Sequence, residues 1–333
     1  MKQLCPSYYS DFRCAAAACP DSCCHQWTVV VDEEAARRYR DLEGSLGDRL
    51  RQVMCLEEGD TVLRLQPDGR CPMLRDDGLC RIHAELGEEA LCDTCRNFPR
   101  LRHDYGDFVE LGLELSCPVA ARMILDDRDC RFVCRDVPGG EAPDYDADAM
   151  RILLHSRRQI LELLRDTAIS VPQALSILLL YGHRVQEALD GGEAAELEPE
   201  RMLQSARSFA QPGRLDDLRD FFSTLEVLTP TWTQRLASPC SGAWEEAHRA
   251  MARYFVNRYW LQAVSDYDLV SRVKLAVVSC LLVKHLGGDV YQTAQQYSKE
   301  IENDADNVDA VLDAAYTHPA LTDVRLLGYL LGE

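Results

Sequence analysis

Cysteine is the residue type in this chain whose number and spacing say most about chemistry. Thirteen of the fifteen cysteines lie within the first 134 residues. Thiolates are soft ligands that suit zinc and iron–sulfur centres, and four of them complete a tetrahedral zinc site or a 4Fe–4S cluster. Those in closely spaced blocks are the predicted metal ligands: Cys14, Cys19, Cys23, Cys24, Cys71, Cys80, Cys92, Cys95 and Cys117. The sequence leaves open whether Cys5, Cys55, Cys130 and Cys134 also take part.

The spacing within these blocks indicates how the sulfurs can meet. Cys92 and Cys95 are separated by two residues, which lets two sulfurs reach one ion from a tight turn. Cys23 and Cys24 are adjacent. Their side chains diverge on a strand, so each can serve a different site unless a turn brings them together. Nine thiols exceed the four that one site needs, so either two sites exist or some thiols support or exchange with one cluster.

Other signatures of catalysis are missing from the sequence. It has no glycine-rich phosphate loop, no Gly-x-Gly-x-x-Gly dinucleotide fingerprint and no His-Glu-x-x-His pair. His25 and His83 lie beside cysteines and can act as ligands, although a surface or hydrogen-bonded histidine is the commoner outcome. A thioredoxin-type role for Cys92 and Cys95 would require a βαβ unit, and a glutamate-rich helical stretch precedes them instead.

The elements that must position the cysteines are predicted to be mixed. A helix is expected from its cap at Asp32 to about residue 54, then a strand over 61–66 closed by a Pro-Asp-Gly turn. A turn over 76–80 is expected to place Cys80. The clearest strand covers 108–116, with Glu110 and Glu114 on its less apolar face, and a short helix over 119–125 follows Cys117.

The rest of the chain is predicted to be helical throughout. The expected helices cover 146–166, 170–191, 198–210, 214–228, 243–264, 269–286, 290–303, 307–316 and 320–331. Glycine and proline over 135–148 indicate a linker or long loop. The fold class is therefore mainly α: a small Cys-rich α+β metal-binding region over 1–135, followed by an all-helical, bundle-like region over 146–333.

Charge and hydropathy narrow the classes of partner. The net charge of −19 excludes non-specific binding to nucleic acid or to an anionic membrane surface, because both need a basic surface. No apolar stretch approaches the roughly 20 residues of a spanning helix, and the first residues lack an apolar signal segment. We therefore expect a cytoplasmic monomer with reduced thiols and a basic or lysine-bearing partner.

The cysteine blocks resemble those of the flagellin lysine-N-methylase (FliB-type) family. The residues that carry the resemblance are Cys71-Pro72-Met73-Leu74, Gly78-Leu79-Cys80-Arg81-Ile82, Cys95-Arg96-Asn97-Phe98-Pro99-Arg100 and Ser116-Cys117-Pro118, with Tyr9-Ser10-Asp11-Phe12-Arg13-Cys14 before them. The helical half is similar at Tyr254-Phe255-Val256-Asn257-Arg258-Tyr259. The blocks are also similar to a broader group of zinc- or iron-chelating cysteine-cluster proteins.

The resemblance implies methyl transfer from S-adenosylmethionine to lysine side chains on flagellin or a similar surface protein. It also implies a 4Fe–4S cluster held by the cysteines, with zinc as the alternative. Lysine must lose a proton before it can attack, and its reference pKa is about 10.4. Glu110 and Glu114 are the predicted base or lysine partner, while strand alternation also allows them a solvated face.

Two other functions remain open from the sequence. One is a non-enzymatic zinc or iron–sulfur module that docks a protein partner through its helical half. The other is a redox or metal-handling protein that uses the Cys92–Cys95 pair.

Overall fold

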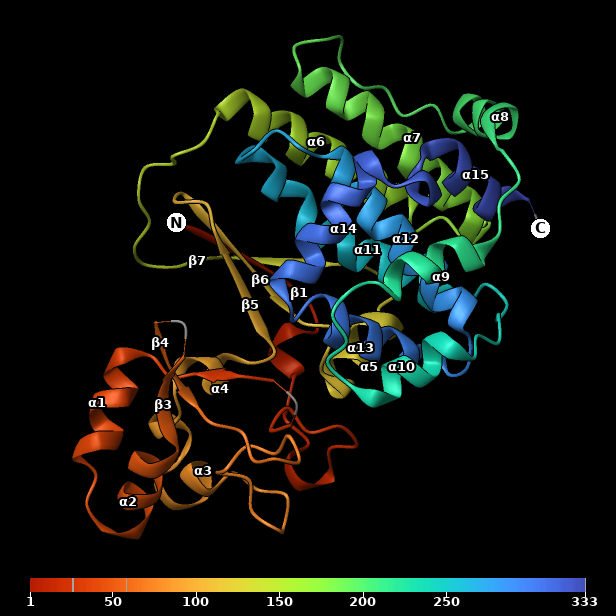
Figure 1. The fold of residues 1–333 in the computed structure, drawn as a ribbon. Coiled ribbons are helices and arrows are strands. Elements are labelled where there is room, and N and C mark those ends of the chain that lie inside the picture. The colour runs from red at the N-terminus through yellow and green to blue at the C-terminus, as the bar shows by residue number, and fades with distance from the viewer. Residues whose placement is uncertain (26, 58, 333) are drawn as a thin grey trace.

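The chain folds into a small cysteine-rich lobe, a four-stranded sheet and a large helical region (Figure 1). The computed structural model describes residues 1–25, 27–57 and 59–332. Within these residues, strands occur only in the N-terminal part, and helices make up the C-terminal part. The predicted fold class, mainly α with a small Cys-rich α+β region, is confirmed.

The small lobe is built from short elements around its own core. Its strands β2 (Val29–Val30), β4 (Asp60–Leu63) and β3 (Met54–Glu57) form an antiparallel sheet in that order. Its helices are α1 (Glu33–Asp41), α2 (Gly44–Val53), α3 (Arg81–Leu86) and α4 (Asp93–Asn97). Tyr39, Leu50 and Met73 are buried at the centre of this lobe.

Two predictions about this lobe need correction. The single helix expected from Asp32 to about residue 54 is two helices, because Leu42 and Glu43 are extended and Gly44 has a φ of +83°. That left-handed conformation favours glycine and interrupts a helix. The strand expected over 61–66 ends at Leu63, although the turn after it forms as expected, with the Gly69 amide donating to the Gln66 carbonyl.

The second sheet joins the N-terminus of the chain to residues around 100–136. Its order is β5 (Arg100–Asp104), β6 (Phe108–Leu113), β1 (Lys2–Pro6) and β7 (Phe132–Asp136). β1 runs parallel to β6 and antiparallel to β7. The strand expected over 108–116 stops at Leu113, and α5 (Pro118–Asp126) follows with proline in its first turn, as expected.

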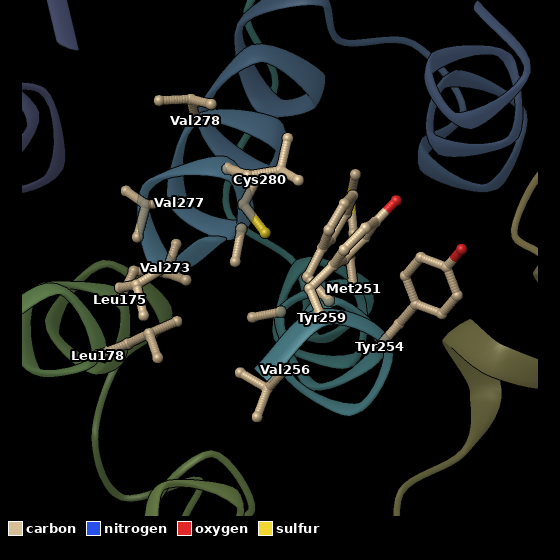
Figure 2. Packing of buried hydrophobic residues seen from close by; sticks show 14 of the residues in the cluster. Leu175, Leu178, Met251, Tyr254, Val256, Tyr259, Val273, Val277, Val278 and Cys280 are labelled. Carbon is tan, nitrogen blue, oxygen red and sulfur yellow. The ribbon is translucent and has the colours of Figure 1, made fainter. Parts of the chain in front are cut away.

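The helical region contains nine of the helices expected from the sequence and one, α10, that the sequence did not predict. They are α6 (Ala147–Leu163), α7 (Val171–Leu189), α8 (Pro199–Phe209), α9 (Leu215–Phe222), α10 (Pro230–Ala237), α11 (Glu246–Tyr259), α12 (Val270–Leu286), α13 (Val290–Ile301), α14 (Ala305–Thr317) and α15 (Asp323–Leu331). The α12 helix is buried along nearly its whole length. Figure 2 shows Leu175 and Leu178 of α7 beside Val273 of α12. None of the described helices is long and apolar enough to cross a membrane.

The buried hydrophobic residues form two separate cores. The smaller core draws its buried residues from 29–92. The larger core begins at Phe12, continues through Phe108, Cys117 and α5, and extends across the helical region. The sheet and α5 thus pack with the helices, although they precede the loop near residue 140. The boundary between 1–135 and 146–333 stays a prediction.

Candidate metal centre

The nine predicted cysteine ligands gather in two groups. The five-thiol group packs on the core of the small lobe and consists of Cys24, Cys71, Cys80, Cys92 and Cys95. The four-thiol group lies where this lobe meets α5 and α13 and consists of Cys14, Cys19, Cys23 and Cys117. Within the second group, a charge on Cys14 raises the pKa of each of the other three thiols.

Backbone hydrogen bonds place three cysteines of the five-thiol group. The amide of Cys71 donates to the carbonyl of Cys24 at 2.9 Å. Leu74 forms a bridge with Cys80, which brings the end of the 75–80 turn back beside Cys71. Gly78, with a φ of +79°, sits in this turn, and its amide donates to Arg75. The turn predicted to place Cys80 is therefore confirmed.

The Cys92–Cys95 pair is fixed to the start of α1 and to β2. One carboxylate oxygen of Asp32 caps α1 at Ala35, and the other accepts the amide of Asp93, both at 2.8 Å. Thr94 donates to the carbonyl of Val30, also at 2.8 Å. A single aspartate thus caps the helix and holds the turn that carries the two thiols.

The four-thiol group depends on a helix from the other end of the chain. Asp21, between Cys19 and Cys23, accepts hydrogen bonds from Gln295 and Lys299 of α13, both at 2.8 Å. Gln295 also donates to the carbonyl of Ser116 at 2.7 Å. This buried glutamine therefore ties the loop of Cys19 and Cys23 to the residue that precedes Cys117.

Burial and sulfur–sulfur contacts set the charge state of the thiols. The Cys23 thiol donates to the Cys24 sulfur, which lowers the pKa of Cys24 to about 7 and raises that of Cys23. A hydrogen bond from Cys95 likewise lowers the pKa of Cys92. Burial raises the pKa of Cys71 to about 12. Metal binding needs the thiolate form, so it must displace protons from most of these sulfurs.

The donor set suits a thiophilic metal, although its geometry is not that of a closed site. Each group offers at least the four soft thiols that zinc or a 4Fe–4S cluster takes. Across residues 1–25, 27–57 and 59–332, no three or more Cys, His, Asp or Glu side chains are close enough together to enclose an ion. Metal binding would therefore require the gathered thiols to turn inward. The nine cysteines stay predicted ligands.

The remaining N-terminal cysteines lie apart from both groups. Cys5 and Cys134 are on strands β1 and β7 of the four-stranded sheet. Cys55 is on β3, with its sulfur 3.2 Å from a Glu57 carboxylate oxygen. Cys130 accepts from the Asn257 side chain. These positions favour the nine cysteines in closely spaced sequence blocks over the other four as ligands.

Glu110 and Glu114, the predicted base or lysine partners, are both turned into the protein. Arg157 of α6 donates to the two carboxylate oxygens of Glu110, at 2.7 and 2.5 Å. Glu114 is 3.3 Å from Arg258 of α11 and accepts from Ser116 at 3.3 Å. The alternative prediction, that strand alternation leaves these two glutamates in solvent, is wrong, because Arg157 of α6 and Arg258 of α11 pair with them.

Glu114 belongs to a buried polar cluster that the sequence reasoning missed. Glu302 accepts hydrogen bonds from Tyr254 and Tyr259 at about the same distance, 3.0 and 2.9 Å, and pairs with Arg258 at 3.3 Å. Burial raises the pKa of Glu114 and outweighs the opposing effect of Arg258. Two carboxylates thus share one guanidinium away from water.

The sequence does carry a signal for one of these arginines. Arg157 follows Leu153 by four residues and precedes Ile160 by three, which places it on the apolar face of α6. A charged residue at a buried helical position needs a partner of opposite charge. That pattern predicts a buried acid opposite α6, and Glu110 supplies it. No comparable local signal marks Gln295, whose partners come from other parts of the chain.

Sequence comparisons find relatives for about a third of this chain. Over 130 residues the chain is 32% identical to the flagellar biosynthetic protein FliU of Salmonella muenchen. This match covers 37% of this chain and 77% of FliU. The chain is also 32% identical over 130 residues to the lysine-N-methylases of Salmonella choleraesuis and Salmonella typhimurium, and this match covers 32% of each of them. The match thus spans about a third of each lysine-N-methylase. No family model matches the chain. No solved structure matches it either.

Proposed function

Because the chain belongs to the family of FliU and the lysine-N-methylases, we propose that it methylates lysine side chains of flagellin or of a similar lysine-bearing protein. The match of 130 residues at 32% identity to the two lysine-N-methylases carries this proposal. S-adenosylmethionine is the proposed donor and would supply an electrophilic methyl group. A 4Fe–4S cluster, or zinc in its place, is the proposed metal component, held by thiolates of the nine cysteines.

The chain's own chemical task is to make the lysine amine neutral. An ammonium has no lone pair, and the reference pKa of lysine is about 10.4. A carboxylate with a raised pKa takes such a proton more readily than an ordinary one. Glu114 fits this role better than Glu110, because burial raises its pKa and its contacts to Arg258 and Ser116 are long. Both oxygens of Glu110 are already held by Arg157.

Charge also supports a basic protein substrate. The chain carries a net charge of −19, and only four of its residues are lysines. Lys2, Lys274 and Lys299 each pair with the carboxylate of an aspartate. An acidic surface attracts a lysine-bearing protein over a distance of about a Debye length.

The test is methyl transfer by the anaerobically purified protein. Flagellin and S-adenosylmethionine are incubated with the protein, and intact and peptide masses are measured. Lysine peptides that gain one or more methyl groups are the expected result. Reactions without the methyl donor, or with heat-unfolded protein, serve as controls. Unchanged flagellin, and no methylation of other lysine-rich surface proteins, would contradict the proposal.

The second candidate is a non-enzymatic metal-binding module that docks a protein partner. One observation favours it: both predicted carboxylates, Glu110 and Glu114, are paired with buried arginines. A protein that binds metal and captures flagellin without transferring methyl groups would support this candidate over the first.

A further inference from the structure

A cavity of about 310 Å³ lies in the helical region, where the start of α9, the end of α12 and α15 meet. The polar side chains that line it are Arg214, Asp216, Ser241, His285 and Tyr329. They come from distant segments of the chain, so folding is what brings them to one place. The proposed methyl transfer uses none of these residues.

The backbone fixes Ser241 beside His285. The two amides that flank Ser241 donate to the two carbonyls that flank His285, at 3.3 and 2.9 Å. Gly287 follows α12 with a φ of +64°, a conformation that favours glycine. A Cβ at Gly287 would also lie only 2.7 Å from the carbonyl oxygen of Cys240. The close approach of the two segments therefore requires glycine at this position.

Ser241 and His285 form a hydrogen-bonded pair of a nucleophile and a base. The Oγ of Ser241 is 2.9 Å from Nδ1 of His285, whereas the backbone carbonyl oxygen of His285 is farther away, at 3.3 Å. With the hydroxyl donating to Nδ1, the proton of the neutral ring is on Nε2. Burial lowers the pKa of His285 and outweighs the raising effect of Asp216. The ring is therefore neutral near pH 7 and can accept the proton of the serine.

Asp216 faces the other nitrogen of this ring. Its Oδ1 is 3.5 Å from Nε2 of His285, and Arg214 and Arg219 hold the carboxylate at 2.9 and 3.0 Å. The Nε2 atom is buried and makes no hydrogen bond within the described residues. Catalytic hydrogen bonds are often long before a substrate binds. A small movement of the ring would let Nε2 donate to Asp216, which then orients the imidazole as the aspartate of a Ser–His–Asp triad does.

The hydroxyl of Tyr329 is a buried group that lacks a partner. Tyr329 is 4% exposed, and its hydroxyl makes no hydrogen bond within residues 1–25, 27–57 and 59–332. Buried polar groups in proteins almost always have a partner, and an oxygen of a molecule in the cavity can supply one here. A hydroxyl that donates to the carbonyl oxygen of an ester stabilises the negative charge that develops on that oxygen.

We propose that this cavity is a hydrolytic site for small esters, separate from the methyl transfer, with Ser241 as the nucleophile, His285 as the general base and Tyr329 as the donor to the oxyanion. The Oγ of Ser241 bonds to the ester carbonyl carbon as its proton passes to His285. The bond from this carbon to the alcohol oxygen breaks, and the alcohol leaves with that proton. Water then bonds to the acyl carbon and gives a proton to His285, and the acid leaves as Ser241 recovers this proton. Asp216 is a positioning residue.

Hydrolysis of p-nitrophenyl acetate by the full-length protein tests this site without flagellin or a methyl donor. The wild type is expected to release p-nitrophenol over many turnovers. Ser241→Ala is expected to lose this turnover and to keep only the single burst that reactive thiols give. Ser238→Ala, at an exposed serine nearby, is the matched control and keeps the wild-type rate. A fluorophosphonate probe, which labels activated serines, is expected to modify Ser241, as located by peptide masses.

Further substitutions separate catalysis from folding. Tyr329→Phe removes only an unpartnered hydroxyl, so thermal stability is expected to stay the same while kcat falls by about 10²-fold and KM changes little. His285→Gln is expected to lower kcat by about 10²-fold or more. Asp216→Asn is expected to lower kcat by about tenfold or more. Asp220→Asn, which alters a contact to the same Arg219, is its matched control and keeps the wild-type kcat.

The outcomes separate this inference from the proposed methyl transfer. No turnover by the wild type, or equal turnover by Ser241→Ala, would overturn the hydrolytic site even if flagellin is methylated. A probe attached to a residue other than Ser241 would also overturn it. Turnover that depends on Ser241 and Tyr329 would support it even if no methyl transfer occurs. Circular dichroism checks that each variant is folded, and if His285→Gln is not, Tyr329→Phe supplies the deciding comparison.

Discussion

At the scale of single residues, a buried ion pair connects the four-stranded sheet to the helical region. Glu110 of β6 and Arg157 of α6 are both nearly inaccessible to solvent, with two hydrogen bonds between them. Removing one partner of such a pair leaves an unpaired charge in the interior. Arg157→Met is therefore expected to lower the free energy of unfolding by roughly 3–5 kcal/mol. Urea unfolding followed by circular dichroism measures this change.

Two further variants show whether the charge is the cause. Arg158→Met changes the exposed neighbouring arginine and is expected to alter stability by less than about 0.5 kcal/mol. Arg157→Met/Glu110→Leu removes both charges and is expected to recover a large part of the loss. If the double variant is as unstable as the single one, packing at Arg157 matters more than its charge.

Glu114 is the residue at which the proposed chemistry is most directly tested. Glu114→Gln keeps the shape and a hydrogen-bonding oxygen but cannot accept a proton, and Glu302 remains to pair with Arg258. Methyl transfer to flagellin is expected to fall by about 10²-fold or more. Bound metal and thermal stability are measured on the same samples and are expected to stay the same. Full activity in this variant would exclude Glu114 as the base.

His248 makes stability depend on pH. Burial lowers the pKa of this histidine from 6.5 to about 4, and its Nδ1 accepts the amide of Glu245 at 3.0 Å. The unfolded chain therefore takes up a proton first as the pH falls below 6.5, which favours unfolding until the folded protein is also protonated near pH 4. The expected loss is on the order of 3 kcal/mol.

A non-titrating substitution isolates this effect from the other acidic groups. His248→Gln keeps an acceptor for the Glu245 amide and has no charge at any pH. The free energy of unfolding of both proteins is measured by urea titration from pH 7.5 to pH 4. The wild type is expected to lose more than the variant over this range. Parallel curves would show that His248 does not titrate differently in the folded state.

Secondary-structure elements differ in how far the sequence alone predicted them. Helices such as α6 and α7 were predicted nearly to the residue, because Asp146 and Ser170 cap them and apolar residues repeat at helical spacing. The sequence did not reveal β1, whose partners on β6 lie more than a hundred residues away. Such a short strand is stabilised by pairing with distant residues, which no local pattern encodes.

The candidate site shows the same limit. Cysteine spacing predicted which thiols would be ligands, and it left undecided whether they form one site or two. The position of the loop that carries Cys19 and Cys23 depends on contacts with distant parts of the chain, through Asp21, Ser116 and α13. The burial of Glu114 under α11 likewise depends on packing between segments far apart in the chain. Neither arrangement can be read from residue types alone.

The α13 helix is expected to control metal binding in the four-thiol group. Gln295→Leu removes the hydrogen bonds to Asp21 and Ser116 while nearly keeping the side-chain volume. Residues that orient metal ligands typically change metal affinity by roughly 10–100-fold when substituted. We expect Co²⁺ affinity at the four-thiol group to fall within this range, and affinity at the five-thiol group to stay the same.

Two background variants assign the effect to one group. Gln295→Leu is combined with Cys80→Ser/Cys95→Ser to read the four-thiol group, and with Cys14→Ser/Cys19→Ser to read the five-thiol group. Gln292→Leu, an exposed position on the same helix, is the matched control. Equal weakening of both groups by Gln295→Leu would indicate a general loss of stability instead of a positioning role.

At the scale of the whole molecule, the two cores should respond differently to loss of metal. The small lobe draws its core from few residues, and five of its cysteines pack on that core. The helical region has a far larger core with α12 at its centre. A metal that binds only the folded lobe stabilises that lobe, and its removal withdraws this contribution.

Hydrogen exchange followed by mass spectrometry can therefore read the two cores separately. After metal removal with a chelator, amides of α1, β3 and β4 are expected to exchange faster, by a factor of ten or more. Peptides from α7 and α12 are expected to keep their protection and act as an internal control. The chelator should have little further effect on Cys80→Ser/Cys95→Ser in the small lobe, because that variant already lacks the local metal. Equal acceleration across both cores would show that the molecule opens as one cooperative unit, in which case the metal of the small lobe stabilises the entire fold.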